Sequence, residues 1–229
     1  KDTMRETIAF LRELAANNNK QWFDANRARY RVLRTRFEEF TAELIDGIGT
    51  FDAEVRGLTP KDCIFRINRD TRFSNDKSPY KTHFSTYICP HGKKSGYAGY
   101  YFHVEPEGDG MIGHSLLASG AVCIPPIVLK SIREEILDNG EQMLASIAAA
   151  KGFEVDRTYS LKRTPTGFPT GTPYDDLLKL KDVCLGRPMS EEELCRADLL
   201  PRTIEAFRST QPFIAQVNRA IQYAYEEMM

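Results

Sequence analysis

Apolar residues recur three or four positions apart in the first fifth of the chain, which is typical of helices that bury one face. Met4, Ile8 and Leu11 begin this pattern. The run Asn17–Asn19 interrupts it, because short polar side chains compete for backbone hydrogen bonds. The pattern resumes from about Lys20 to Asp46. The sequence therefore predicts one helix before the three asparagines and a longer helix after them.

In the middle of the chain the spacing of apolar residues changes to every second position, which indicates strands. The clearest case is residues 100–105, where Tyr100, Phe102 and Val104 alternate with Tyr101, His103 and Glu105. This pattern predicts a half-buried strand, and residues 63–68 and 82–89 are two further candidates. Short connections rich in turn-forming residues favour antiparallel pairing between these strands.

The last part of the chain returns to helical spacing. Pro126 can start a helix that runs to about Lys151, with a possible break at Asn139–Gly140. Residues 177–184 are a further candidate strand, and a terminal helix is expected to begin after Pro212. The simplest arrangement is α+β: a mainly antiparallel sheet from the middle of the chain packed against N-terminal and C-terminal helices. We predict a single domain over residues 1–229.

Composition narrows the class of protein. The 229 residues are 41% hydrophobic and 28% charged with a formal net charge of −1, so no overall field attracts nucleic acid or a membrane. The five cysteines are scattered and never form a CxxC pair, which favours a reducing compartment. We find no secretory signal and no apolar run long enough to span a bilayer. We therefore expect a cytoplasmic protein, and the sequence carries no signal for its oligomeric state.

Positive charge is concentrated in residues 66–81, here called the basic segment. Its cations, set against only Asp70 and Asp76, are Arg66, Arg69, Arg72, Lys77 and Lys81. Because the segment contains no glycine, side chains rather than a cradle of backbone amides would hold an anion. We predict that these five cations, with Arg163 as a contributor, bind a small phosphate- or carboxylate-bearing ligand, with or without turnover. Asp70, Asp76 and Tyr80 would orient them.

Three alternatives remain open at this level. The charges of the basic segment can instead pair internally, which would leave a structural or interaction protein. A nucleic-acid-binding surface is another possibility, and its cations would be Arg27, Arg31, Arg34, Lys77, Lys81, Lys93 and Lys94. Catalysis within the segment would use Lys77 or Tyr80 as acid or base if either pKa were depressed. The sequence does not decide whether the protein is an enzyme.

Other chemistry has weaker support. His103 and Glu105 share one face of a predicted strand and resemble half of a 2-His-1-carboxylate metal site, and His114 lies close by in the sequence. A third ligand with recognisable spacing is missing, so we expect a half-exposed strand histidine, and we predict no metal and no cofactor. The chain lacks a GxSxG motif, and its one GxG, at residues 108–110, precedes no predicted helix.

The basic segment and several motifs outside it resemble a family catalogued as domain of unknown function 2461. The resemblance covers nearly the whole chain and is most specific in the basic segment. The matching residues are Phe10, Leu11, Leu14, Asn18, Trp22, Phe23, Tyr30, 65–67, 69–73, 76–82, 99–101, Arg133, Pro165, Gly167, Phe168, Leu177, Leu178 and Lys181. The resemblance implies no catalytic role for any residue, because it brings no assigned activity.

Overall fold

The computed structural model describes residues 3–108 and 110–229. The helices of the N-terminal half, including one short 3-10 helix η1, are α1 (Thr3–Ala16), α2 (Lys20–Ala25), α3 (Arg27–Gly49), η1 (Ala53–Val55) and α4 (Pro60–Cys63). The strands are β1 (Phe84–Ile88), β2 (Gly99–Val104), β3 (Ser115–Ala121), β4 (Glu154–Val155) and β5 (Val183–Met189). The helices of the C-terminal half are α5 (Pro126–Asp138), α6 (Gly140–Ala149), α7 (Asp175–Leu178), α8 (Glu191–Leu194) and α9 (Leu199–Glu227).

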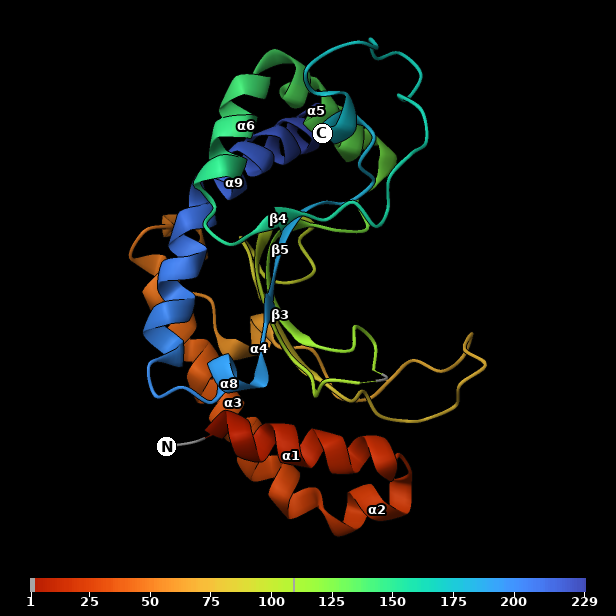
Figure 1. Ribbon diagram of the computed structural model, residues 1–229, viewed down its shortest axis with the longest axis vertical. Coiled ribbons are helices and arrows are strands. Elements are labelled where there is room, and N and C mark those ends of the chain that lie inside the picture. Colours follow the sequence, from red (N-terminus) through yellow and green to blue (C-terminus); the bar gives the residue numbers. More distant parts are fainter. Residues whose placement is uncertain (1–2, 109) are drawn as a thin grey trace.

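The strands of the described residues form one antiparallel sheet in the order β1-β2-β3-β5-β4. Figure 1 shows α3 and α9 along one side of this sheet, with α1 and α2 at one end of the molecule and α5 and α6 at the other. The core lies between the sheet and the helices: Phe37 of α3 meets Phe102, and Phe207 of α9 meets Tyr100. The α+β class predicted from the sequence is confirmed.

Two predicted helices are each divided in the structure. The helix expected over residues 20–46 breaks at Asn26, whose backbone leaves the helical region and whose side-chain amide donates to the carbonyl of Trp22. The break predicted at Asn139–Gly140 is confirmed, since Asn139 separates α5 from α6. Gly140 is required at this corner because a Cβ there would lie 2.3 Å from the ring of Tyr174.

The terminal helix does not begin after Pro212, as the sequence suggested. Instead α9 runs from Leu199 to Glu227 with Pro212 inside it, and Figure 1 shows that it changes direction along its length. A proline removes one helical hydrogen bond and usually kinks the helix. Ser209 and Thr210 donate their hydroxyls to carbonyls in the preceding turn, and the buried Phe207 and Phe213 hold both sides of the proline in the core.

Two predicted strands are wrong in their boundaries. Residues 63–68 form no regular strand, although Ile64 pairs with Thr86 and Asn68 pairs with Tyr80 through isolated bridges. In the second case α7 takes the first two residues of the predicted strand 177–184, and β5 begins only at Val183. Leu177 and Leu178 are buried, and a buried apolar run of this length cannot be assigned to helix or strand from its pattern alone.

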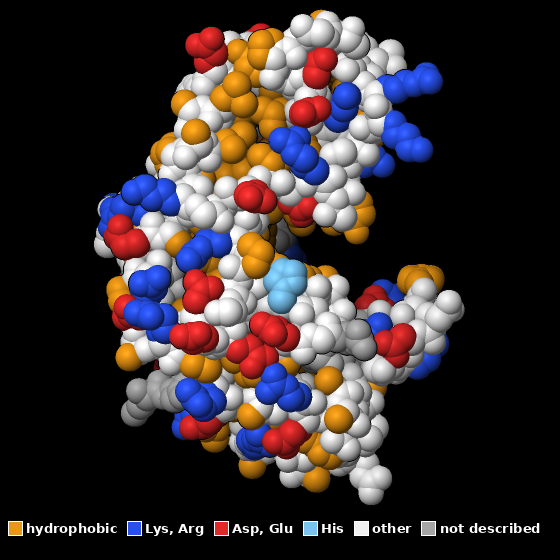
Figure 2. Space-filling model, in the orientation of Figure 1, with side chains coloured by type: hydrophobic (Ala, Val, Ile, Leu, Met, Phe, Trp, Pro, Cys, Tyr) orange, Lys and Arg blue, Asp and Glu red, His pale blue; other side chains and the backbone are white. Residues whose placement is uncertain are grey.

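The side of the sheet opposite α3 and α9 carries no helix of the described residues (Figure 1). Alternation along the strands places Tyr87, Tyr101, Leu116 and Gly186 on this side, here called the open face, and each of them is half-buried. Figure 2 shows a deep indentation of the molecule on the same side. Among the described helices, none combines the length and apolarity that crossing a bilayer requires.

Candidate functional site

The basic segment is a long loop between α4 and β1 whose two ends are joined by backbone hydrogen bonds. Arg69 N donates to Pro79 O at 2.9 Å, and Lys81 N donates to Ile67 O at 2.8 Å. These bonds close the loop at its base, and Figure 1 shows it extending past the end of the sheet on the side of the open face. The segment is therefore held as a protrusion rather than as a continuous strand.

Arg69 is the residue that holds the interior of this loop together. Its Nη1 donates to Ser78 O at 2.8 Å and to Asp76 Oδ2 at 2.9 Å, and its Nη2 lies 3.3 Å from Ser74 Oγ. Asp76 in turn accepts from the amide and hydroxyl of Ser78, and these bonds, with the nearby Arg69, lower the pKa of its carboxyl group. Asp76 therefore holds Arg69 in place and at the same time neutralises its charge.

Arg72 and Lys77 are also occupied by the loop itself. The guanidinium of Arg72 makes two hydrogen bonds to the carboxylate of Asp70, at 2.9 and 2.7 Å. The hydrogen bond from Arg72 lowers the pKa of Asp70. Lys77 Nζ donates to Thr71 O at 2.8 Å. The alternative of internal pairing thus describes Arg69 and Arg72, while Lys77 has a carbonyl partner and keeps its net charge.

Arg66 and Lys81 differ from Arg69 and Arg72, because neither is paired with a carboxylate among the described residues. Lys81 Nζ donates to the carbonyl of Arg66 at 2.6 Å. Burial lowers the pKa of Lys81, and the charges of Arg66 and Arg34 lower it further. Arg66 and Lys81 therefore place two cations at the base of the loop that no carboxylate of the described residues neutralises.

Arg163, the remaining predicted ligand residue, lies on a second long loop, residues 156–174. This loop also carries the exposed Arg157 and Lys162, and none of these three cations forms an ion pair within the described part of the chain. Figure 1 shows the loop extending past the open face at the end of the sheet opposite the basic segment. The two loops border the indentation seen in Figure 2, and the structure does not bring Arg163 into contact with the basic segment.

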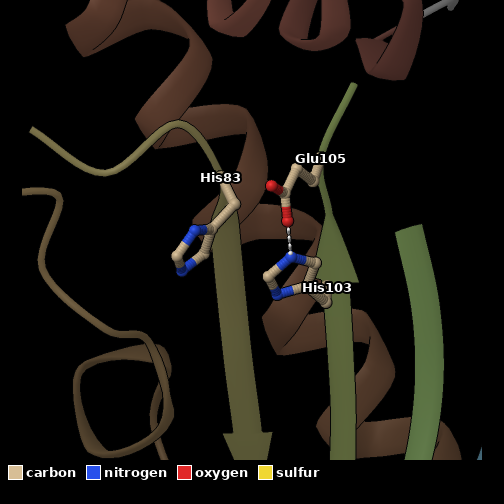
Figure 3. Close-up of side chains that lie close together, drawn as sticks. All are labelled: His83, His103 and Glu105. Atoms are coloured by element: carbon tan, nitrogen blue, oxygen red, sulfur yellow. Dashed lines mark hydrogen bonds and ion pairs between the residues drawn. The ribbon is translucent and has the colours of Figure 1, made fainter. Parts of the chain in front are cut away.

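The most unusual chemistry lies at the edge of the open face, where His83, His103 and Glu105 form a buried cluster (Figure 3). His103 Nε2 lies 2.6 Å from Glu105 Oε2, and the rings of His83 and His103 stack with centroids 4.4 Å apart. The expectation of a half-exposed His103 is wrong, since its exposed fraction is 0% and that of Glu105 is 1%. Tyr101 extends the cluster, because its hydroxyl lies 2.7 Å from His103 Nδ1.

Burial strongly affects the protonation of this cluster. It lowers the pKa of His83 to about 3, with the neighbouring His103 as a further cause, so His83 is neutral near pH 7. Burial alone would raise the pKa of Glu105, but hydrogen bonds and charge from His103 and the backbone amides of the following loop lower it overall. Glu105 is therefore an ionised carboxylate inside the protein.

Sequence reasoning missed His83, although a signal for it exists. The register pairs Phe84 with Val104 and Ser85 with His103, so the residue before Phe84 lies opposite the residue after Val104. Antiparallel pairing of these two candidate strands would have indicated that His83 and Glu105 face each other. His114, which the sequence brought into consideration, is half-buried and outside the cluster.

The base of the basic segment is fastened to the N-terminal helices. Asn18, between α1 and α2, donates to Tyr80 O at 2.8 Å and accepts from Tyr80 N at 3.1 Å. The ring of Tyr80 stacks on Phe23 of α2 with a centroid distance of 4.0 Å. Tyr80 is buried at 6% exposure, so its main contribution is to position the segment.

The arginines of α3, which suggested a nucleic-acid surface, mostly have carboxylate partners. Arg27 pairs with Asp24, and Arg34 pairs with Glu38 while also donating to Phe65 O. Two further arginines of this helix pair with glutamates of α1. These ion pairs reduce the charge that the helix could present to a phosphate backbone.

Comparison with known proteins adds a family without adding an activity. No curated protein and no solved structure matched the chain. The family model described as "Conserved hypothetical protein (DUF2461)" matches residues 6–215. That range includes the basic segment, the cluster of His83, His103 and Glu105, and every strand of the sheet. The chain therefore belongs to the DUF2461 family of conserved hypothetical proteins.

Proposed function

We propose that this protein binds a small phosphate- or carboxylate-bearing molecule over the open face of the sheet, between the basic segment and the loop 156–174. The observation that carries the proposal is the distribution of unpaired charge. Arg66 and Lys81 on one side, and Arg157, Lys162 and Arg163 on the other, have no carboxylate partner in the described residues. Arg69 and Arg72 are neutralised and serve to shape the loop.

The surface between the two loops suits such a ligand. Tyr87 and Tyr101 offer half-buried rings, which provide apolar contact beside the cations. The hydroxyl of Tyr87 is already used, since it donates to carbonyls of Tyr97 and Gly120. Specific recognition of the anionic group would therefore come from the loop cations, and contact with the rest of the ligand from the sheet.

The expected affinity for a bare anion is low. A hydrogen bond to a charged group contributes about 1.5–3 kcal/mol. Three convergent bonds give roughly 5–9 kcal/mol, from which association costs of about 4 kcal/mol or more must be subtracted. The balance of about 1–5 kcal/mol corresponds to a dissociation constant of about millimolar or weaker. A phosphate concentration about ten times the dissociation constant would raise the free energy of unfolding by about 1.4 kcal/mol. For a chain of this size, that corresponds to a rise in Tm of about 3 to 6 °C.

The test is a thermal-shift series with phosphate, sulfate, simple carboxylates and nucleotides, each against chloride at equal ionic strength. We expect Lys81→Met and Arg163→Met each to reduce the shift by at least half. The matched control is Arg202→Met, which removes an exposed cation from α9 on the helical side of the sheet. Absence of a shift with every anion, or an equal loss in the control variant, would contradict the proposal.

An oligonucleotide binding assay at low salt separates this proposal from the nucleic-acid alternative. Binding of DNA or RNA that weakens steeply with salt, and that persists in Lys81→Met, would favour the alternative. Binding of small anions without retention of oligonucleotides supports the function proposed here.

A further inference from the structure

The cluster of His83, His103 and Glu105 has the composition of a metal site. One ring nitrogen of each histidine and one carboxylate oxygen all lie within 4.8 Å of one another. Figure 3 shows that the three side chains come from two neighbouring strand segments, His83 before β1 and the other two on β2 and at its end. Two imidazoles and one carboxylate form the facial triad that binds divalent first-row transition metals and leaves further coordination positions open.

Two atoms of the cluster are shielded from solvent and have no hydrogen-bond partner within the described residues: His83 Nδ1 and Glu105 Oε1. Both side chains are more than nine-tenths buried, at 6% and 1% exposure. Buried polar atoms almost always have a partner, and an exception calls for a bound ion, a water molecule or a chemical role. These two atoms belong to the same cluster, which favours one shared ligand over two unrelated defects.

The surroundings support the same conclusion. A Cβ on Gly110 would lie 1.5 Å from Glu105 Oε1, so this glycine allows the loop after β2 to cover the carboxylate closely. Ile112 N donates to Glu105 Oε2 at 3.2 Å, and Ser115 Oγ donates to the backbone carbonyl of Glu105 at 2.9 Å. Metal-binding carboxylates are commonly held by such outer hydrogen bonds.

The orientation of the His103 ring also suits a metal ligand. The hydroxyl of Tyr101 lies on the Nδ1 side of His103, which leaves Nε2 facing Glu105. A metal that takes Nε2 replaces the His103–Glu105 hydrogen bond, and Nδ1–H of His103 then donates to the oxygen of Tyr101, as the second ring nitrogen of a metal-binding histidine usually does.

We propose that His83, His103 and Glu105 bind one divalent first-row transition-metal ion, with Tyr101 as the positioning residue for His103. This site departs from the sequence-based expectation of no metal, because His83 supplies the third ligand that the spacing alone did not indicate. Its three ligands are not among the loop cations of the anion proposal, and the two sites share only Tyr101, whose ring lies on the open face and whose hydroxyl contacts His103.

The test is titration of the full-length, chelator-treated protein with Co²⁺, followed by visible absorption, and then displacement by Zn²⁺. We expect saturation at one equivalent with an apparent Kd below about 10 µM. Glu105→Gln and His83→Gln should weaken binding by about 100-fold or more, and Tyr101→Phe by about 10-fold. His91→Gln, which changes an exposed histidine outside the cluster, should leave binding unchanged.

Each outcome decides the proposal. Failure of the folded wild-type protein to bind Co²⁺, Zn²⁺ or Fe²⁺ stoichiometrically at micromolar concentration overturns it and leaves a water molecule as the partner of the two buried atoms. Equal weakening in His91→Gln also overturns it. Should Glu105→Gln fail to fold, the wild-type titration and His83→Gln still decide. If the wild-type protein binds no metal but its Tm still rises with phosphate, the metal proposal is wrong and the anion proposal is unaffected.

Discussion

Replacing Arg69 by Met should open the basic segment locally, whereas the same change at Arg72 should leave it closed. Arg69 Nη1 donates to the carbonyl of Ser78 at 2.8 Å, and its side chain is only 24% exposed. A hydrogen bond from a charged group to such a partner contributes about 2 kcal/mol. We add nothing for the ion pair with Asp76, because that carboxylate is fully exposed.

A loss of about 2 kcal/mol raises the population of the open loop by about 30-fold, since each 1.4 kcal/mol corresponds to a factor of ten. Arg72 bonds only to its near neighbour Asp70 and its side chain is 77% exposed, so its removal should not change the opening equilibrium measurably. The two variants lose the same charge and differ only in what the arginine contacts.

The assay is amide hydrogen exchange at the two backbone bonds that close the loop, Arg69 N to Pro79 O and Lys81 N to Ile67 O. We expect exchange at position 69 to accelerate by about 30-fold in Arg69→Met and to stay within about twofold of wild type in Arg72→Met. Equal acceleration in both variants would falsify the assignment of Arg69 as the residue that holds the loop. Unchanged exchange in both would show that the base of the loop closes without either arginine.

Three further outcomes can be measured by denaturation. Tyr100→Phe should lower the free energy of unfolding by about 1.5–3 kcal/mol in a urea titration, because it removes a 2.9 Å hydrogen bond to the buried carboxylate of Asp52; no change would contradict this account. Gly120→Ala should lower the free energy of unfolding by about 3 kcal/mol or more, since the φ of Gly120 is +149° and a Cβ would lie 2.2 Å from a carbonyl oxygen of β5. The control Gly186→Ala, which has open space around it, should lower the free energy of unfolding by less than about 1 kcal/mol. The pKa of Asp175 is lowered from 3.8 in the folded protein, first by a hydrogen bond from the hydroxyl of a threonine three residues earlier. The ionised carboxylate therefore stabilises the fold above pH 3.8, and this stabilisation is lost as the pH falls through the lowered pKa of the folded state. Asp175→Asn should make the free energy of unfolding fall less steeply with decreasing pH in the acid range.

The sequence predicted well those features that depend on local spacing. The alternation over residues 100–105 gave β2 almost to the residue, and Asn139 marked the end of α5. Features that depend on contacts between distant segments were not accessible in this way. Pro212 reads as a helix start, yet the core on either side of it keeps α9 continuous. His103 reads as half-exposed, because nothing local shows that His83 and Tyr101 lie against its ring.

The candidate sites show the same division. The density of cations in residues 66–81 identified an unusual segment, but spacing alone could not show which of them are free. Arg69 and Asp76 are seven residues apart, and only the folded loop brings them to 2.9 Å. Predicting that His83 belongs to the buried cluster would have required the register between β1 and β2, and a register cannot be derived from the local pattern of either strand alone.

The paired hydrogen bonds between Asn18 and Tyr80 couple the position of the N-terminal helices to that of the basic segment. Asn18 sits at the corner between α1 and α2, and Tyr80 is followed immediately by Lys81. A binding partner that shifts α1 and α2 at Asn18 should therefore also shift Lys81. In the reverse direction, occupancy beside Lys81 should stiffen the corner, so a fluorescence reporter on Trp22 would sense events more than fifty residues away in the chain.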